Sequence, residues 1–251
     1  MTPELDPAFL ARPIAHRALH GQSRPENSRA AVEAAVAGGW GIEVDVQISR
    51  DGVPLVFHDY QLDRLTNGQG AVAALDLAAL HELRLKGSDE TIPTLEEIAG
   101  IVAGRVPLLV EIKDQDGALG PAVGRLEEAV GRVLAGYSGP LAVMSFNPNA
   151  VRVMQEHLPH VPRGIVTDAF RAENWPLVPP ARRARLALIP DIHASGASFI
   201  SHNRRFLESA PVLALKARGL SVLTWTVRSA AEAEEAYRVA DQITFEGFLP
   251  G

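Results

Sequence analysis

The chain of 251 residues contains no cysteine. That absence excludes disulfide scaffolds, zinc thiolate sites, thiol catalysis and iron–sulfur clusters. Long hydrophobic runs are also missing, because Gly, Pro or a charged residue interrupts every apolar run before the about 18 residues of a membrane-spanning helix. Residues 1–11 carry Asp and Glu and no apolar run, unlike a secretory signal or transit peptide. We therefore expect no membrane span and a cytoplasmic location.

The chain has slightly fewer basic residues than acidic ones. Lys and Arg number 24 against 30 Asp and Glu, and the net charge is −6. We therefore expect no nucleic-acid partner, and any phosphate chemistry requires a local site. Hydrophobic residues make up 47% and charged residues 22%, which is typical of a globular protein. At this length an α/β barrel forms a single domain, so we predict one domain over residues 1–251.

Short apolar, β-branched segments alternate with longer segments of helical periodicity along the chain. This alternation predicts α/β architecture with a parallel sheet. The predicted strands are Pro13–His16, Gly41–Ile48, Val106–Ile112, Leu141–Phe146, Gly164–Thr167, Ala197–Ser201, Ser221–Val227 and Gln242–Phe245. The predicted helices are Ser28–Ala37, Ala118–Leu134, Asn149–Leu158, Arg204–Arg218 and Ser229–Val239, and residues 170–196 are expected to form loop with at most short helices.

One connection departs from this alternation. Asp51-Gly52 separates the second predicted strand from the apolar run 53–57, and Asp-Gly in that position predicts a β-hairpin. A turn centred near residues 50 and 51 places His58 opposite Glu43 and near Asp45. Residues 59–105 then form a small insertion before the next strand of the sheet.

Two strands carry charged residues in an apolar setting. Glu43 and Asp45 are separated by one residue, as are Glu111 and Lys113, so the side chains of each pair leave one face of a strand. An unpaired buried carboxylate costs several kcal/mol, so a neighbouring cation or metal ion is expected at a buried face. The alternatives are a solvent-exposed face for the first pair, and for the second a strand end that becomes polar as it enters a loop.

Two histidines lie beside these carboxylates in the predicted fold. His16 ends the first strand next to Arg17, and His58 follows the hairpin next to Asp59. Either histidine alone is compatible with a structural role. Imidazoles exchange protons near neutral pH, so together with three carboxylates at strand ends the two histidines predict an acid–base pair beside a metal site.

These motifs together resemble the glycerophosphodiester phosphodiesterase family. The resemblance extends from about residue 14 to about residue 245, in the family's order and spacing. The residues that carry it are His16-Arg17, Pro25-Glu26-Asn27-Ser28, Glu43-Val44-Asp45-Val46, Asp51-Gly52, Val56-Phe57-His58-Asp59, Leu62-Asp63-Arg64, Ile92-Pro93-Thr94-Leu95-Glu96-Glu97, Glu111-Ile112-Lys113, Ser145-Phe146 and Trp225-Thr226-Val227.

The resemblance implies a (β/α)₈ TIM barrel with a β-hairpin after the second strand and a small insertion before the third. It also implies metal-dependent hydrolysis of glycerophosphodiesters to sn-glycerol 3-phosphate and an alcohol. Carried over by position, the implied roles are metal binding by Glu43, Asp45 and Glu111, acid–base catalysis by His16 and His58, phosphate binding by Arg17 and Lys113, and substrate contacts by Glu26 and by Trp225 along the glycerol.

Three carboxylates without Cys or His ligands suit one hard cation, Mg²⁺ or Ca²⁺. Two alternatives share this barrel. The first acts on another phosphodiester, as sphingomyelinase-D-like or inositol-phospholipid-cleaving relatives do. The second is a catalytically silent phosphate-binding protein. The oligomeric state, the head group and the order of the two histidines in proton transfer stay open.

The chain departs from the family pattern at three places. Ala18 follows His-Arg where the family usually has Gly, which allows close backbone approach or a positive φ. Arg228 stands where Asn is usual. The closing motif, which usually reads Asp-Gly before its strand and Thr-Asp after it, is Asp241-Gln242 and Thr244-Phe245-Glu246 here. These departures bear on substrate specificity more than on the class of reaction.

Overall fold

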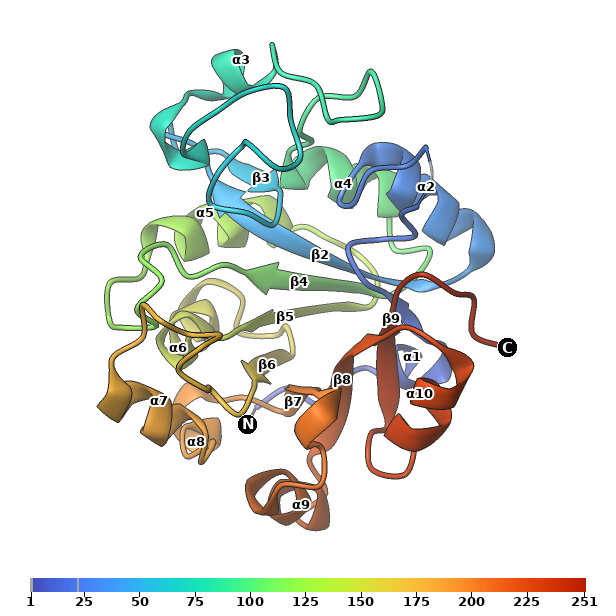
Figure 1. Ribbon diagram of the computed structural model, residues 1–251, viewed down its shortest axis with the longest axis vertical. Coiled ribbons are helices and arrows are strands. Elements are labelled where there is room, and N and C mark those ends of the chain that lie inside the picture. Colours follow the sequence, from blue (N-terminus) through green and yellow to red (C-terminus); the bar gives the residue numbers. More distant parts are fainter. Residues whose placement is uncertain (1, 22) are drawn as a thin grey trace.

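The strands of this protein close into a barrel. The computed structural model describes residues 2–21 and 23–251, and in this part of the chain eight parallel strands hydrogen-bond in a ring, β1 pairing with both β2 and β9 (Figure 1). The strands of the ring are β1 (Ile14–Ala15), β2 (Gly41–Ile48), β4 (Leu108–Ile112), β5 (Leu141–Ser145), β6 (Arg163–Thr167), β7 (Phe199–Asn203), β8 (Ser221–Val227) and β9 (Gln242–Phe245). The predicted (β/α)₈ barrel and all eight predicted strands are confirmed.

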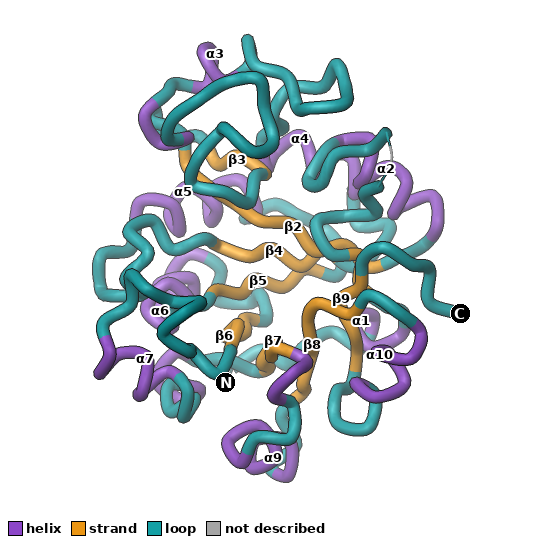
Figure 2. The backbone as a smooth tube through the Cα atoms, viewed as in Figure 1, coloured by secondary structure: helices purple, strands orange, loops and turns teal. Residues whose placement is uncertain are grey.

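Helices surround the strands, as the tube in Figure 2 shows. They are α1 (Ala8–Ala11), α2 (Arg29–Gly38), α3 (Leu77–Leu80), α4 (Leu95–Val102), α5 (Arg125–Leu134), α6 (Pro148–His157), α7 (Pro180–Leu186), α8 (Ile192–Ser195), α9 (Ala210–Ala217) and α10 (Ala230–Ala236), with 3₁₀ turns η1 (Val72–Ala74) and η2 (Arg204–Phe206). None of these helices has the length and apolarity to cross a membrane.

Three predicted helices are shorter than expected. The helix predicted over Ser229–Val239 is α10, which ends at Ala236. The helix predicted from Ala118 begins at Arg125, because Gly117, Leu119 and Gly124 all adopt positive φ angles that interrupt helical geometry. The helix predicted over 204–218 is split into η2 and α9. Pro211 lies in the first turn of α9, where a proline starts a helix but cannot continue one from the preceding turn.

The alternation of side chains along the strands places the carboxylates inside the barrel. Val44 and Val46 of β2 belong to the apolar layer between strands and helices. Glu43 and Asp45 therefore point to the opposite face, where Glu43 is paired in register with Leu109 of the barrel interior. Both carboxylates are 1% exposed, so the solvent-exposed alternative is wrong.

The predicted hairpin is present, with a register one residue different from the expected one. β3 (Pro54–Val56) runs antiparallel to β2 outside the ring and pairs Val46 with Val56. Ser49 and Val53 close a loop of residues 50–52, in which Gly52 has φ +90°. A three-residue loop of this kind ends with a residue of positive φ, which explains the shift. His58 therefore does not lie directly opposite Glu43, although both line the same cavity.

The insertion after the hairpin packs Leu62, Val72, Leu80, Leu85 and Ile92 against Leu55 of β3 and against Phe57, in an apolar cluster separate from the barrel core. It ends at α4, whose first turn is closed by reciprocal hydrogen bonds between Thr94 and Glu97. In Figure 1 the insertion lies at the top of the view, beyond β2 and β3. Its first residues, Asp59 and Tyr60, reach the edge of the barrel opening.

Candidate active site

The predicted site residues come together at the carboxyl ends of the strands. A cavity of about 190 Å³, here called the inner cavity, is lined by His16, Arg17, Glu43, Asp45, His58, Glu111, Lys113, Met144, Phe146, Ser201, Trp225, Thr226, Arg228 and Thr244. Eight of the nine residues singled out from the sequence are in this set. The ninth, Glu26, contacts the set through Arg17, whose Nη1 donates to Glu26 Oε1 over 2.7 Å.

Three carboxylates converge in the inner cavity. Oxygen atoms of Glu43, Asp45 and Glu111 lie within 4.8 Å of one another, and all three residues are buried. Glu43 Oε2 accepts from the backbone N–H of Arg17 over 2.8 Å. Glu43 Oε1 has no hydrogen-bond partner within residues 2–21 and 23–251, which the structure describes. A buried carboxylate oxygen without a donor is open to a cation.

Neighbouring charges shift the pKa values of Glu43 and Asp45 in opposite directions. Burial and the adjacent carboxylates of Asp45 and Glu111 raise the pKa of Glu43 well above its usual value. Burial would raise the pKa of Asp45 too, but the charges of Lys113, His58 and Arg17 hold it below the usual range. Lys113 Nζ lies 2.7 Å from Asp45 Oδ1 and 2.6 Å from Glu111 Oε1. Arg17 Nε also approaches Asp45 Oδ2 to 3.4 Å. Asp45 and Glu111 thus have cationic side-chain partners and Glu43 has none in the described part of the chain, so a divalent cation fits beside Glu43.

The loop before α2 holds Asp45 in place. Asn27 Nδ2 donates to Asp45 Oδ2 over 2.9 Å, and Asp45 N donates to Asn27 Oδ1 over 3.2 Å. Ser28 caps α2 by accepting from the backbone of Ala31. Periodicity does not show which strand this loop contacts, so the contact of Asn27 with Asp45 was not predicted from the sequence.

A hydrogen bond to Asp59, itself bound by Arg64, orients the second histidine. His58 Nδ1 lies 2.7 Å from Asp59 Oδ1, and Arg64 Nε donates to Asp59 Oδ2 over 2.6 Å. Arg64 also donates to both oxygens of Glu26, which in turn binds Arg17. Burial would raise the pKa of Asp59, but the hydrogen bonds from His58 and Arg64 lower it. The insertion is thereby tied to the first barrel loop through charged side chains.

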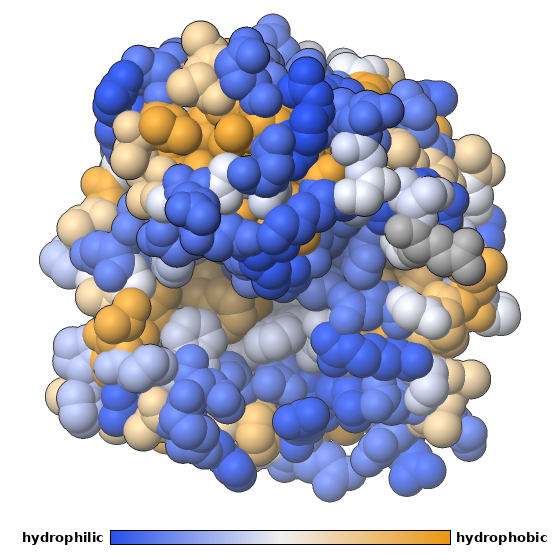
Figure 3. All heavy atoms as spheres, turned by 45° about the horizontal axis from the view of Figure 1, so that its top comes forward, coloured by the Kyte–Doolittle hydropathy of each residue, from blue (hydrophilic) through white to orange (hydrophobic). Residues whose placement is uncertain are grey.

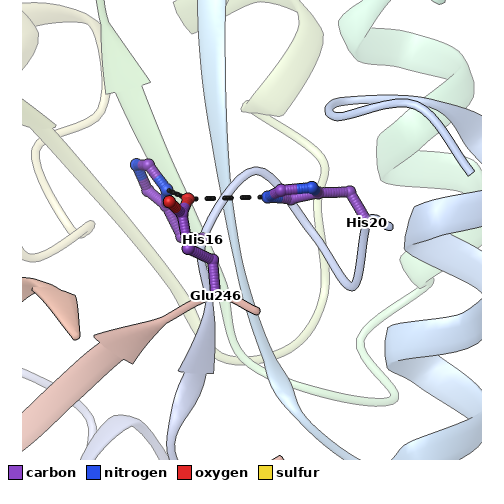
Figure 4. Close-up of side chains that lie close together, drawn as sticks. All are labelled: His16, His20 and Glu246. Carbon is purple, nitrogen blue, oxygen red and sulfur yellow. Dashed lines mark hydrogen bonds and ion pairs between the residues drawn. The ribbon is translucent and has the colours of Figure 1, made fainter. Parts of the chain in front are cut away.

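His16 has a carboxylate partner that sequence reasoning missed. His16 Nδ1 lies 2.5 Å from Oε2 of Glu246, the residue after β9, and His20 Nε2 approaches the same oxygen to 3.6 Å (Figure 4). Arg228 Nε donates to Glu246 Oε1 over 2.8 Å. Burial lowers the pKa of His16, although the hydrogen bond to Glu246 opposes this. The neutral imidazole is thus favoured, with Nδ1 committed to Glu246.

Two of the three departures from the family pattern therefore meet at one point. Arg228 and Glu246 bind each other beside His16, and this pairing could be found only in three dimensions. The third departure, Ala18, adopts φ +63°, the region that favours glycine, and its methyl group is buried in the apolar core.

A second, larger cavity adjoins the first. This outer cavity of about 500 Å³ shares His58, Glu111, Lys113, Phe146 and Trp225 with the inner cavity. Its other lining residues are Asp59, Tyr60, Gln61, Ile112, Asp114, Leu119 and Trp175. In Figure 3, which brings the insertion forward, a hollow with partly hydrophobic walls lies below the insertion. Trp175 was not predicted, because it lies in the irregular segment 170–196, where periodicity gives no signal.

Comparison with known proteins shows which family this chain is related to. The model of the glycerophosphoryl diester phosphodiesterase family matches residues 16–244. YhdW of Bacillus subtilis (strain 168), provisionally named a glycerophosphodiester phosphodiesterase, is 30% identical over 86% of this chain and 86% of its own length. A glycerophosphodiester phosphodiesterase of Caldanaerobacter subterraneus subsp. tengcongensis is 34% identical over 64% of this chain and 69% of its own.

Solved structures agree with the sequence comparisons. A phosphodiesterase of Oleispira antarctica, solved in complex with the product sn-glycerol-3-phosphate, superposes with a TM-score of 0.78. It is 29% identical, and the match covers 95% of this chain and 94% of that one. The barrel, the order of the site motifs and the relatives lead to one conclusion: the chain is an enzyme of the glycerophosphoryl diester phosphodiesterase family.

Proposed function

We propose that this enzyme hydrolyses glycerophosphodiesters to sn-glycerol 3-phosphate and an alcohol with the help of one divalent cation, Mg²⁺ or Ca²⁺. One observation carries the proposal: three buried carboxylates and two histidines line a single small cavity. The substrate class is supported by the names of the relatives and by the product bound to the Oleispira antarctica structure.

The cation would be held by Glu43, Asp45 and Glu111, whose oxygen donors suit a hard ion. When bound, Mg²⁺ or Ca²⁺ supplies positive charge that stabilises a phosphodiester under attack. Arg17 and Lys113 line the same cavity and would bind the phosphate oxygens. Removal of one such electrostatic donor typically costs about 10²–10³ in rate.

The two histidines would transfer the protons. Each commits Nδ1 to a carboxylate, His16 to Glu246 and His58 to Asp59, which leaves Nε2 for the substrate. One imidazole takes a proton from the nucleophile. The nucleophile is either water, which gives glycerol 3-phosphate directly, or the neighbouring glycerol hydroxyl, which gives a cyclic phosphate that water then opens. The other imidazole gives a proton to the departing alkoxide, so that the phosphorus–oxygen bond to the alcohol breaks without releasing a free alkoxide.

We expect the purified protein to release choline and glycerol 3-phosphate from sn-glycero-3-phosphocholine when Mg²⁺ or Ca²⁺ is present. Excess chelator should abolish turnover, and re-addition of the ion should restore it, because three carboxylates cannot clamp the phosphate by themselves. The products are measured by chromatography. Unchanged turnover after chelation would rule out the metal requirement.

The same assay separates the alternatives. Turnover of a choline lipid together with inertness toward glycerophosphocholine would favour a sphingomyelinase-D-like enzyme. Release of inositol phosphate from an inositol phospholipid would favour the other phosphodiesterase class. Phosphate-ester binding without turnover of any diester would indicate the silent barrel.

Glu246 is expected to act as a positioning residue for His16. Glu246→Ala removes the oxygen that fixes Nδ1, so we expect kcat to fall about 10–100-fold with little change in KM. Glu246→Gln keeps an acceptor for Nδ1 and should recover part of the loss. Glu234→Gln, on the exposed face of α10, makes the same change of charge as a control. Equal activities of all three variants would remove Glu246 from the mechanism.

A further inference from the structure

We propose that the outer cavity binds the alcohol portion of the diester and selects neutral, apolar alcohols over cationic ones. This inference rests on the proposed function and deepens it. The family comparisons identify the phosphodiester chemistry and a glycerol phosphate product, but they leave the preferred alcohol undefined.

The sizes and positions of the two cavities indicate which part of the diester each would bind. The inner cavity is small and mostly polar, with Arg17, Thr226 and Thr244 in its lining, and its volume of about 190 Å³ suits a phosphate with glycerol. His58 and Lys113 line both cavities, so the reacting phosphorus would lie at their junction. The larger outer cavity then receives the group on the other side of the phosphate.

Aromatic rings form one wall of the outer cavity. The ring centroid of Phe146 lies 4.8 Å from that of Trp175 and 5.5 Å from that of Trp225. Ile112 and Leu119, which are almost fully buried, also line the cavity. Rings and aliphatic side chains in such contact offer dispersion and apolar burial to a ligand rather than hydrogen bonds.

The polar atoms of the wall are already used by the protein. Each of three aromatic side chains donates its hydrogen to a protein oxygen: Tyr60 Oη to the carbonyl of Asp114 over 2.7 Å, Trp175 Nε1 to Asp168 Oδ2 over 2.8 Å, and Trp225 Nε1 to the carbonyl of Ser201 over 3.0 Å. These three side chains therefore turn their apolar surfaces, and not their donors, toward a ligand.

The charged groups of the outer cavity do not favour a cation. Asp59 accepts hydrogen bonds from Arg64 at both of its oxygens, and its Oδ1 also lies 2.7 Å from His58 Nδ1. The carboxylate of Asp114 accepts from the side-chain amide of Asn147 and from the backbone N–H of Leu119. Lys113 and Glu111, which both line the cavity, bind each other over 2.6 Å. A quaternary ammonium would therefore meet carboxylates that already have partners, and would lose its hydration without a dedicated anion.

The arrangement also assigns a step to His58. With the alcohol in the outer cavity, the leaving oxygen lies on the His58 side of the phosphorus. His16, which lines the inner cavity, takes the proton from the nucleophile as the new phosphorus–oxygen bond forms. His58 gives its proton to the alcohol oxygen as the old phosphorus–oxygen bond breaks, so water and diester become glycerol 3-phosphate and a neutral alcohol.

The decisive comparison uses two diesters of the same shape. sn-Glycero-3-phosphocholine and its analogue with 3,3-dimethylbutanol differ only in that a neutral carbon replaces the ammonium nitrogen. We expect kcat/KM of the wild-type enzyme to be at least about tenfold higher for the neutral analogue. Equal or higher kcat/KM for the choline ester would overturn the proposal, because attraction of the cation by aromatic faces would then prevail. Failure of both diesters to yield glycerol 3-phosphate would refute the proposed function instead.

A chain-length series provides the second test. For glycerophospho esters of ethanol, propanol and butanol, kcat/KM should rise about fourfold per methylene in the wild type. Trp175→Ala should flatten this rise, and Trp175→Phe should largely keep it because an aromatic wall remains. Leu188→Ala, an exposed residue in the same irregular segment, should keep the full rise. A flat series in the wild type, or an unchanged rise in Trp175→Ala, would contradict an apolar alcohol site.

Discussion

Replacement of either site histidine by alanine is expected to lower kcat for sn-glycero-3-phosphocholine by at least about a hundredfold. General acid–base catalysis contributes about 10²–10⁴ per group, and His16 and His58 both line the inner cavity. Steady-state kinetics with saturating metal ion measures the effect. Circular dichroism should show an intact fold, because each side chain lies at the cavity edge and not in the apolar core.

His193→Ala is the matched control for this experiment. His193 is an exposed histidine of α8, far in the chain from both site histidines, so its removal should leave kcat unchanged. Kinetics close to wild type in His16→Ala or His58→Ala would remove the corresponding imidazole from proton transfer and would require another group in its place.

The second large effect is expected from Glu43→Gln. A neutral amide cannot replace the carboxylate in a hard-cation site. Affinity for Mg²⁺ or Ca²⁺ should therefore fall by more than about a hundredfold, which exceeds the typical loss when a residue that only hydrogen-bonds to a metal ligand is replaced. Isothermal titration calorimetry measures it. Glu33→Gln, on the exposed side of α2, makes the same chemical change as a control. An unchanged binding constant in Glu43→Gln would exclude Glu43 as a ligand.

Glu43→Gln should weaken metal binding, but it should make the metal-free protein more stable at neutral pH. In the metal-free protein, burial and the nearby carboxylates raise the pKa of Glu43, so the folded state binds its proton more tightly than the unfolded chain. The free energy of unfolding in chelator should therefore fall as pH rises from the ordinary glutamate range through the folded pKa. Glu43→Gln should remove that part of the fall in urea unfolding at several pH values. A steeper fall in the variant would contradict the repulsion inferred among the three carboxylates.

The elements of the barrel could be predicted because burial leaves a clear pattern in the chain. Gly41–Ile48 and Leu108–Ile112 are buried along their whole length, and their apolar and β-branched residues mark them as strands. The hairpin was visible in Asp51-Gly52, but its register was not. That register depends on whether two or three residues form the loop, and a local conformation of Gly52 decides it.

The part of the site whose residues lie on strands could be predicted from the sequence. The carboxyl ends of parallel strands meet at one end of a barrel, so Glu43, Asp45 and Glu111 could be brought together in principle from their positions alone. The partners of the histidines could not be predicted. Glu246, which follows β9, binds His16, and Arg64 of the insertion binds Asp59 beside His58. Such contacts depend on loop paths that periodicity does not encode.

In the outer cavity too, a residue on a strand was predictable and a residue in a loop was not. Trp225 belongs to β8, so its place near the site followed from the strand. Trp175 lies between β6 and α7, and only the folded loop brings its ring to Phe146. Specificity for the alcohol is therefore expected to depend on residues that strand and helix patterns do not reveal. The residues proposed to act in catalysis lie on strands or next to them, and those patterns do reveal the strands.

We propose that three carboxylates hold one cation, with a histidine on each side of the phosphate. A crystal structure of the protein with Ca²⁺ and sn-glycerol 3-phosphate would show whether they do. We predict one ion bound by Glu43, Asp45 and Glu111, with the phosphate between His16 and His58 and within hydrogen-bond distance of both. An ion bound elsewhere, or a phosphate out of reach of either imidazole, would contradict the account.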